Sequence, residues 1–478
     1  MKKIILYSAL FSTVAFTGCK KFLDTLPDNR TSLNTPGKVA EMLVSAYPKA
    51  SYIPFCEAMS DNADDKGIAE SETYNSVPYV WGDVPEKDQD APDYYWNGAY
   101  EAIAAANQAL DAINSAANQK AYTAQRGEAL VARAYAHFML VTLFSKAYDP
   151  ATAASDPGVP YVTTPEKVVL QSYERKTVSY VYEMIEKDLT EGLPLLNDAS
   201  YKVPAYHFTQ KAAHAFASRF YLFKQDYAKV IEHASLVFPG NNFRDNMRDW
   251  LVTYDQLTYA ELRAIYTKAS ENANLLLAEA TTWWGRNYPS YRYGLTPDLM
   301  NKVLGGNVTG GAWAYGIYGD DEHLNIPKFN EYFVREGLNA NSGLGYNMIP
   351  LFTTEEVLLN RAEAYVRSNN NTAALEDINV FASGRIVGFS PARMVTENKA
   401  KAYYNTTDAK VALINTILDF KRAEFMHEGL RWFDIIRLKM PVVHKKNDEK
   451  LTLSPTDPRR LLQLPQEVKL AGLDLNPR

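Results

Sequence analysis

Three carboxylates lie close together near the end of the chain, in the segment KRAEFMHEGLRWFDIIR at residues 421 to 437. Two facing carboxylates, such as those of Glu424 and Glu428, could hydrolyse a glycosidic bond if no cation neutralised them. Here arginines interleave with the acids, and Glu428 and Asp434 each have an arginine three residues later. We therefore predict that these carboxylates form ion pairs with neighbouring arginines along one helix. Glycoside hydrolysis is the alternative.

The sequence motifs that would bind a metal ion or a nucleotide are each incomplete in this chain. His427 and Glu428 begin a pattern like that of a zinc peptidase helix, but the residue four positions after His427 is Arg431. The segment DNADD at residues 61 to 65 lacks the spacing and terminal glutamate of a calcium loop, so we interpret it as a solvated acidic loop. The glycines of residues 305 to 311 lack the lysine of a phosphate-binding loop. The sequence predicts no metal site and no cofactor.

Aromatic residues outside the predicted helices indicate sugar binding. A pyranose ring can pack its C–H face on an aromatic plane, while its hydroxyls need polar partners at the rim, and Tyr and Trp offer both kinds of surface. The predicted carbohydrate-binding residues are Trp81, Trp283, Trp284, Tyr288, Tyr291, Trp313 and Tyr318, with Arg286 and Asn287 beside them. The alternative is that these rings seal the core beneath the loops. We assign Trp96 and Trp432, on predicted helices, to packing.

The N-terminus has the pattern of an export signal. Lys2 and Lys3 precede an apolar stretch from Ile4 to Phe16, which is shorter than the roughly 20 residues of a membrane-spanning helix. Residues 1 to 18 are therefore a predicted signal peptide, and Cys19 the predicted site of lipidation, which would anchor the mature chain to a membrane. A signal peptide that ends by chance at a cysteine is the alternative.

Helical periodicity dominates the rest of the chain and predicts a mostly α-helical fold. The expected helices are residues 94–113, 124–144, 177–196, 209–223, 226–238, 355–369, 372–384 and one long helix at 418–438. Alanine-rich helices followed by short polar turns resemble tetratricopeptide hairpins, and ordinary alanine-rich helices without a repeat are the alternative. Gly429, inside the long helix, predicts the close approach of another backbone.

The composition changes along the chain in a way that suggests five parts. They are the signal peptide, a lipidated N-terminus and tether at residues 19–38, a helical part at 39–240, a loop-rich ligand-binding region with few short strands at 241–352, and a second helical part at 353–478. The formal net charge of −6 excludes the basic footprint of a nucleic-acid-binding protein.

Several segments together resemble the SusD or RagB family of nutrient-uptake lipoproteins of the Bacteroidetes outer membrane. They are CKKFLDTLPDN, YEAIAAANQAL, RGEALVARAYAHFMLVTLF, EVLLNRAEAY and, as the most specific, KRAEFMHEGLRWFDIIRLK. The resemblance spans nearly the whole chain. It implies a superhelix of four tetratricopeptide-like hairpins packed against a loop-rich ligand-binding part.

The resemblance also implies a function that is not catalytic. Such a protein binds a glycan at the cell exterior and acts as a lid on a SusC-like, TonB-dependent outer membrane transporter. Its ligand residues would lie near Trp81 and within residues 283 to 318. A tetratricopeptide scaffold that binds another protein is a further alternative, beside the hydrolase.

Overall fold

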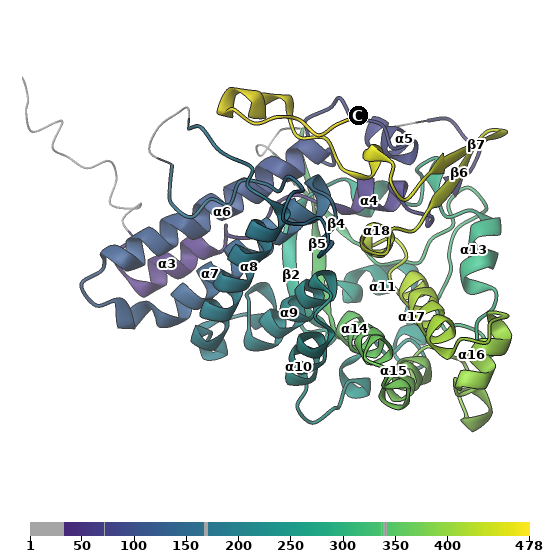
Figure 1. The fold of residues 1–478 in the computed structure, drawn as a ribbon. Coiled ribbons are helices and arrows are strands. Elements are labelled where there is room, and N and C mark those ends of the chain that lie inside the picture. Colours follow the sequence, from purple (N-terminus) through teal and green to yellow (C-terminus); the bar gives the residue numbers. More distant parts are fainter. Residues whose placement is uncertain (1–32, 71, 167–170, 336, 338–339, 341) are drawn as a thin grey trace, which may run out of the picture.

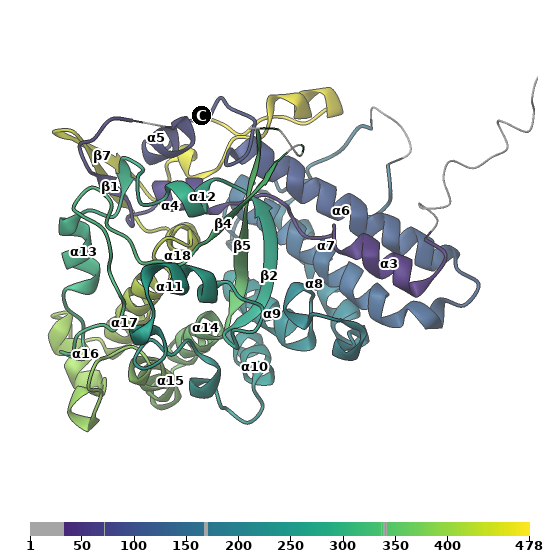
Figure 2. The ribbon, with the colours of Figure 1, turned by 180° about the vertical axis from the view of Figure 1, so that it is seen from behind.

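The computed structural model describes residues 33 to 478 apart from residues 71, 167–170, 336, 338–339 and 341. A small antiparallel sheet stands between two groups of helices, as Figures 1 and 2 show. Its strand order is β2 (Asn274–Thr281), β5 (Gly343–Thr353) and β4 (Glu331–Arg335), so that β4 forms one edge. The predicted mostly α-helical fold with few short strands is confirmed.

The first group of helices packs side by side and follows the predicted spans closely. It consists of α6 (Pro92–Ser115), α7 (Thr123–Phe144) and α8 (Val178–Gly192). From Gly127 onward α7 is buried on all sides, because alanines and large apolar residues cover its whole circumference. The backbones of α7 and α8 approach so closely that a Cβ on Gly127 would lie 2.9 Å from the carbonyl oxygen of Gly192.

Two helical hairpins have the short polar turns that the sequence predicts. They are α9 (Gln210–Lys224) with α10 (Tyr227–Val237), and α14 (Thr354–Arg367) with α15 (Asn371–Ser383). The chain reverses through a left-handed residue, Gln225 with φ 64° or Asn369 with φ 61°. The next residue then caps the second helix, because the side chains of Asp226 and Asn370 accept backbone N–H groups from its first turn.

The other elements are short and surround the sheet and the hairpins. The helices are α3 (Pro36–Leu43), α4 (Ile53–Met59), α5 (Thr73–Tyr79), α11 (Tyr259–Tyr266), α12 (Trp284–Asn287), α13 (Pro297–Leu304) and α16 (Glu397–Tyr403). Two further strand pairs are β1 (Asp64–Asp65) with β3 (Tyr293–Gly294), and β6 (Val442–Lys446) with β7 (Glu449–Leu453). Within the described residues, none of the helices has both the length and the hydropathy to span a membrane.

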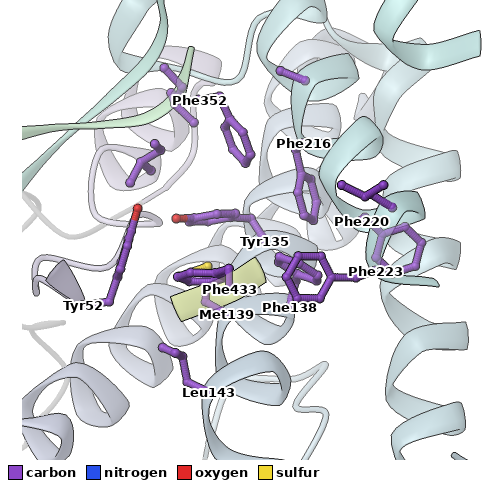
Figure 3. Close-up of a cluster of buried hydrophobic side chains, with 14 of the residues drawn as sticks. Tyr52, Tyr135, Phe138, Met139, Leu143, Phe216, Phe220, Phe223, Phe352 and Phe433 are labelled. Atoms are coloured by element: carbon purple, nitrogen blue, oxygen red, sulfur yellow. The ribbon is translucent and has the colours of Figure 1, made fainter. Parts of the chain in front are cut away.

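One aromatic core joins the helices to the sheet. Figure 3 shows rings that converge from the segment before α4, from α7 and α9, from β5 and from the helix α18 described below. Tyr135 lies edge-on to Phe216 and Phe352, with ring centroids 5.6 Å away in both cases. Phe433 lies edge-on to Tyr52 at 5.4 Å. Because edge-to-face contacts fix ring orientation, this core holds elements from the whole chain in one arrangement.

The predicted single helix at residues 418–438 is wrong, because the chain breaks into α17 (Ala409–Glu424) and α18 (Leu430–Arg437). His427 and Gly429, between the two helices, are left-handed with φ 71° at both. The buried carboxylate of Glu57 accepts the backbone N–H of His427 at 2.6 Å and that of Gly429 at 2.9 Å. We call residues 425–429 the α17–α18 junction.

The close backbone approach predicted at Gly429 is confirmed. A Cβ at this position would lie 3.1 Å from Cβ of Cys56 and 3.2 Å from Cα of Ile53, both in α4. Glycine is therefore needed at the junction for its left-handed φ and also for the space that a side chain would occupy.

Replacing Gly429 with alanine tests the α17–α18 junction. The left-handed backbone costs an alanine roughly 1–2 kcal/mol, and contact with α4 adds a further strain of about 1–2 kcal/mol. We expect the free energy of unfolding of Gly429→Ala to fall by about 2–4 kcal/mol in urea denaturation.

Gly240→Ala is the matched control, because a Cβ there would meet nothing nearer than 3.7 Å. We expect a change within about 0.5 kcal/mol for this variant. Equal stabilities of the two alanine variants would contradict the junction described above.

Candidate functional site

The carboxylates that suggested hydrolysis are buried and bound by cations. Arg385 donates to Glu424 from Nε at 2.6 Å and from Nη2 at 3.0 Å, and the hydroxyl of Tyr315 donates to it at 2.5 Å. Lys328 and Tyr266 each donate to Glu428 at 2.6 Å. These partners come from distant parts of the chain, which sequence spacing cannot reveal.

The predicted ion pair between Glu428 and Arg431 is therefore wrong. Arg431 instead binds Asp61, from Nε at 2.7 Å and from Nη2 at 3.0 Å, and Glu428 lies in the α17–α18 junction, outside the helix that carries Arg431. The predicted neighbouring pair of Asp434 and Arg437 is confirmed, with Nη2 of Arg437 at 2.6 Å from Oδ1 of Asp434.

The geometry gives no support to hydrolysis by Glu424 and Glu428. Both side chains are almost fully buried, at 1% and 3% exposure, so neither faces a space that a glycan could enter. Burial by itself would raise the pKa of Glu424, but the charge and hydrogen bonds of Arg385 lower the pKa below its usual value. A glycosidase acid needs the opposite shift, since it must hold a proton at neutral pH.

The acidic segment at residues 61–65 binds arginines. Arg292 donates to Asp65 from Nε at 2.7 Å and from Nη2 at 2.9 Å, and Asp61 accepts from Arg431 as described above. The interpretation of a solvated acidic loop is wrong for these two aspartates, because ion pairs hold both. Among the described residues, no three or more His, Cys, Asp or Glu side chains are grouped so that they could hold a metal ion.

Three of the predicted carbohydrate-binding rings lie beneath the surface. Trp284, Tyr288 and Tyr291 are buried, and the Trp284 ring lies 5.5 Å from that of Tyr288 and 5.8 Å from that of Tyr291. The indole N–H of Trp284 donates to the backbone oxygen of His427 at 3.0 Å. Because these three rings are buried beneath the surface, the structure gives no evidence that they contact a sugar directly.

Trp81 is also buried, but it lines a cavity. Its ring stacks on His444 at 4.6 Å, and on the other side of His444 the ring of Tyr79 stacks at 4.1 Å. The indole N–H donates to the backbone oxygen of Met59 at 3.0 Å. The cavity has a volume of about 250 Å³, and Arg459 and other charged side chains line it together with Trp81.

Trp313 and Tyr318 are half-buried and pack against other elements. Trp313 stacks on Tyr315 at 5.5 Å and meets Phe420 of α17 edge-on at 5.3 Å. Tyr318 lies 5.3 Å from Tyr259 of α11. The partners of Trp313 and Tyr318 differ from the partner of Trp283, which is Phe333. The predicted residues therefore do not form one continuous surface.

Trp283 and Arg286 do come together, at α12 beside the sheet (Figure 2), whereas the side chain of Asn287 interacts with the buried Tyr291. The Trp283 ring stacks on Phe333 of β4 with centroids 6.3 Å apart, and Phe333 is 39% exposed. The guanidinium of Arg286 lies 4.8 Å from the Trp283 ring and donates to Glu331 at 2.6 Å. We call Trp283, Arg286, Glu331 and Phe333 the Trp283 platform.

Two glycines of β5 make room for the rings of the platform. A Cβ on Gly345 would lie 2.6 Å from ring carbons of Trp283. A Cβ on Gly343 would overlap the backbone oxygen of Val334 in β4 and would lie 2.8 Å from the ring of Phe333. The two glycines share one face of the strand because side chains alternate along it. Aromatic rings thus cover glycines that would otherwise weaken the sheet.

A buried aspartate fixes the backbone of the platform. Asp90 accepts the N–H of Trp283 at 2.9 Å and a hydrogen bond from the hydroxyl of Thr282. Burial raises the pKa of Asp90 to about 7. Next to it, the side-chain oxygen of Asn347 accepts the N–H of Gly285 at 2.9 Å.

Sequence reasoning missed Asp90, Glu331 and Phe333. Phe333 and Glu331 lie in EYFVR, a short segment beyond the aromatic window of residues 283 to 318. The spacing of Gly343 and Gly345 was the one sequence feature that could have indicated these residues. Two glycines on one face of a strand leave space that large side chains from other elements commonly fill.

Comparisons with known proteins agree with this architecture. A family model described as "Starch-binding associating with outer membrane" matches residues 21–222, and one described as "SusD family" matches residues 206–458. The chain belongs to the SusD family. The resemblance noted in the sequence is thereby confirmed.

Solved structures share the SusD fold at low identity. A SusD superfamily protein from Bacteroides thetaiotaomicron is 20% identical with a TM-score of 0.68, and the match covers 93% of this chain and 100% of that one. A SusD-like carbohydrate binding protein from Bacteroides vulgatus is 18% identical with a TM-score of 0.67, over 92% and 96% of the two chains. A laminarin binding SusD-like protein is 17% identical with a TM-score of 0.62, over 93% and 99%. No curated protein matches this SusD-family chain.

The raised pKa of Asp90 predicts a pH-dependent stability that the variant Asp90→Asn lacks. Because the folded state holds the proton more tightly than the unfolded chain does, the stabilisation is complete below the unfolded pKa and is lost as the pH rises to about 7. We expect the unfolding free energy of the wild type, minus that of Asp90→Asn, to fall between about pH 4 and pH 7 and then to level off.

Urea denaturation at several pH values measures this difference. The other titrating groups contribute equally to the unfolding free energies of both proteins, so their contributions cancel. Asp111→Asn, at an exposed position of α6, controls for the loss of a carboxylate in general. A difference that stays constant from pH 4 to pH 8 would show that Asp90 is not the buried acid described here.

Proposed function

We propose that this SusD-family protein is a cell-surface lipoprotein that captures oligosaccharides or polysaccharides and delivers them to a SusC-like, TonB-dependent outer membrane transporter. The observation that carries the proposal is the Trp283 platform, in which two partly exposed rings stand beside the charged side chains of Arg286 and Glu331. Such a surface offers stacking to a sugar ring and hydrogen bonds to its hydroxyls. We propose a binding role without catalysis, since Glu424 and Glu428 are buried and bound by cations.

The platform suits binding because its parts are held in place before a ligand arrives. Trp283 is fixed through its backbone by Asp90 and by close contact with Gly345, and Arg286 is oriented by Glu331. Each side chain that is ordered in advance spares the ligand an entropic cost of about 0.5–1.5 kcal/mol. The geometry therefore favours recognition by a rigid surface.

Several observations support the proposed location. The family is described as associating with the outer membrane, and the sequence pattern predicts lipid on Cys19, which lies outside the described residues. Each buried methylene of an acyl chain contributes about 0.8 kcal/mol, so more than one chain on Cys19 would give a lasting anchor. Delivery to a SusC-like partner rests on the family resemblance.

Replacing Trp283 with alanine tests the glycan-binding proposal. Loss of a stacking ring costs on the order of 1–2 kcal/mol, so we expect Trp283→Ala to weaken binding by roughly five- to thirtyfold. Affinity electrophoresis through a panel of polysaccharides measures this, and laminarin belongs in the panel because one solved SusD-like relative is described as binding it. The panel is also assayed for released sugars, and release of any would refute the proposed absence of catalysis.

Two further variants sharpen the result. Tyr403→Ala removes an aromatic ring that is 48% exposed on α16, outside the platform, and should bind as the wild type does. Gly345→Ala keeps Trp283 but displaces its ring, and should lose binding. If no polysaccharide retards the wild type, or if Trp283→Ala and Tyr403→Ala behave alike, the platform is not a glycan site.

Replacing Cys19 with serine tests the lipid anchor. A serine cannot form the thioether to diacylglycerol, so we expect Cys19→Ser to move from the membrane fraction to the soluble fraction of the cell. Cys56→Ser is the matched control, because Cys56 is buried and should leave the anchor unaffected. Wild type and Cys19→Ser in the same fraction would argue against lipidation.

A further inference from the structure

The Trp283 platform exposes a guanidinium and covers its carboxylate. The side chain of Arg286 is 52% exposed, whereas that of Glu331 is 9% exposed. Arg286 binds Glu331 through Nη2, and its Nε and Nη1 have no hydrogen-bond partner among the described residues. A ligand that packs on Trp283 therefore meets the N–H groups of a guanidinium, which can donate hydrogen bonds but cannot accept them.

A second arginine adds positive charge beside the ion pair of the platform. Arg263 of α11 donates from Nε to the carbonyl oxygen of Phe329 and from Nη2 to that of Gly285, at 2.6 Å in both cases. Gly285 directly precedes Arg286 in α12. Phe329 lies two residues before Glu331, which begins β4, and α12 and β4 are in contact (Figure 2).

Only one carboxylate in the described part of the chain pairs with either of these arginines. It is that of Glu331, and the acidic residues 320–322 pair with neither arginine. Burial, and in addition the charges of Asp88 and Glu72, raise the pKa of Asp90 to about 7, so Asp90 carries a proton at lower pH. Among the described residues, the side chains of Asp88 and Glu72 form no hydrogen bond or ion pair with the platform. Two cations therefore stand against one directly paired anion.

We propose that the platform binds an acidic glycan, whose sugar rings carry carboxylate or sulfate groups. This inference rests on the proposed function and names the class of glycan. A guanidinium can hold an anionic group through two parallel N–H···O bonds, while the sugar ring packs on Trp283. A neutral sugar gains less, because its hydroxyls also donate hydrogen bonds and the one carboxylate of the platform is covered.

Affinity electrophoresis of the full mature protein through polygalacturonate and through its methyl ester tests the proposal. The two polymers share one backbone and differ in charge, and dextran sulfate with dextran forms the corresponding pair for sulfate. We expect the acidic member of at least one pair to bind about tenfold or more tightly than the neutral member. Because salt screens exposed charges, we expect this preference to shrink at high salt.

The two proposals fail in different ways. If laminarin or another neutral glycan binds and neither pair shows a preference for its acidic member, the acidic class is wrong and the proposed function stands. If no polysaccharide binds, both proposals are wrong. The pair that shows the preference tells whether the platform recognises carboxylate or sulfate.

The double variant Arg286→Gln/Glu331→Gln separates local recognition from the overall charge of the protein. It removes one charge of each sign and leaves the net charge unchanged, so we expect a loss of about tenfold or more in affinity for the acidic glycan. Glu174→Gln/Lys176→Gln removes an exposed ion pair outside the platform and should bind as the wild type does. Equal affinities of the two double variants would refute the role of Arg286. Circular dichroism checks that both variants fold.

Discussion

The carboxylate of Glu57 connects parts of the chain that are far apart in sequence. It lies in α4 near the N-terminus and accepts two N–H groups of the α17–α18 junction near the C-terminus. Beside the junction, Lys328 from the middle of the chain binds Glu428, and Arg385 binds Glu424. A buried charge that loses its partner costs about 3–5 kcal/mol, so each region holds the others in place. The segment with the Trp283 platform joins the same network, because the indole of Trp284 donates to the backbone of His427.

The sequence predicts the helices well where local physics decides them. The buried α7 and the polar turns at Gln225 and Asn369 follow from apolar pattern, helix caps and turn residues. The same reasoning fails at residues 425–429, where apolar periodicity continues through a break. That break depends on Glu57, about 370 residues earlier in the chain, and periodicity within a window carries no information on so distant a partner.

The candidate site shows the same limit at the level of neighbouring residues. Trp283 and Trp284 are adjacent in sequence, yet the first forms a partly exposed surface and the second lies in the core. Because both residues are tryptophan, residue type alone predicts the same role for both, either sugar binding or packing in the core. What separates them is the space above Gly345 and the acceptor offered by His427, and both features come from other parts of the fold. Sequence therefore predicts a region of aromatic side chains, and tertiary structure decides which of these rings are exposed.

The position of Cys56 against Gly429 has a further consequence. Its side chain is fully buried, and burial raises the pKa of the thiol well above the usual value. The thiolate is the species that attacks alkylating reagents, so this sulfur reacts only when α4 separates from the C-terminal helices. The rate at which Cys56 is alkylated therefore reports the local opening of the molecule, and mass spectrometry can measure it without a mutation that introduces a new cysteine.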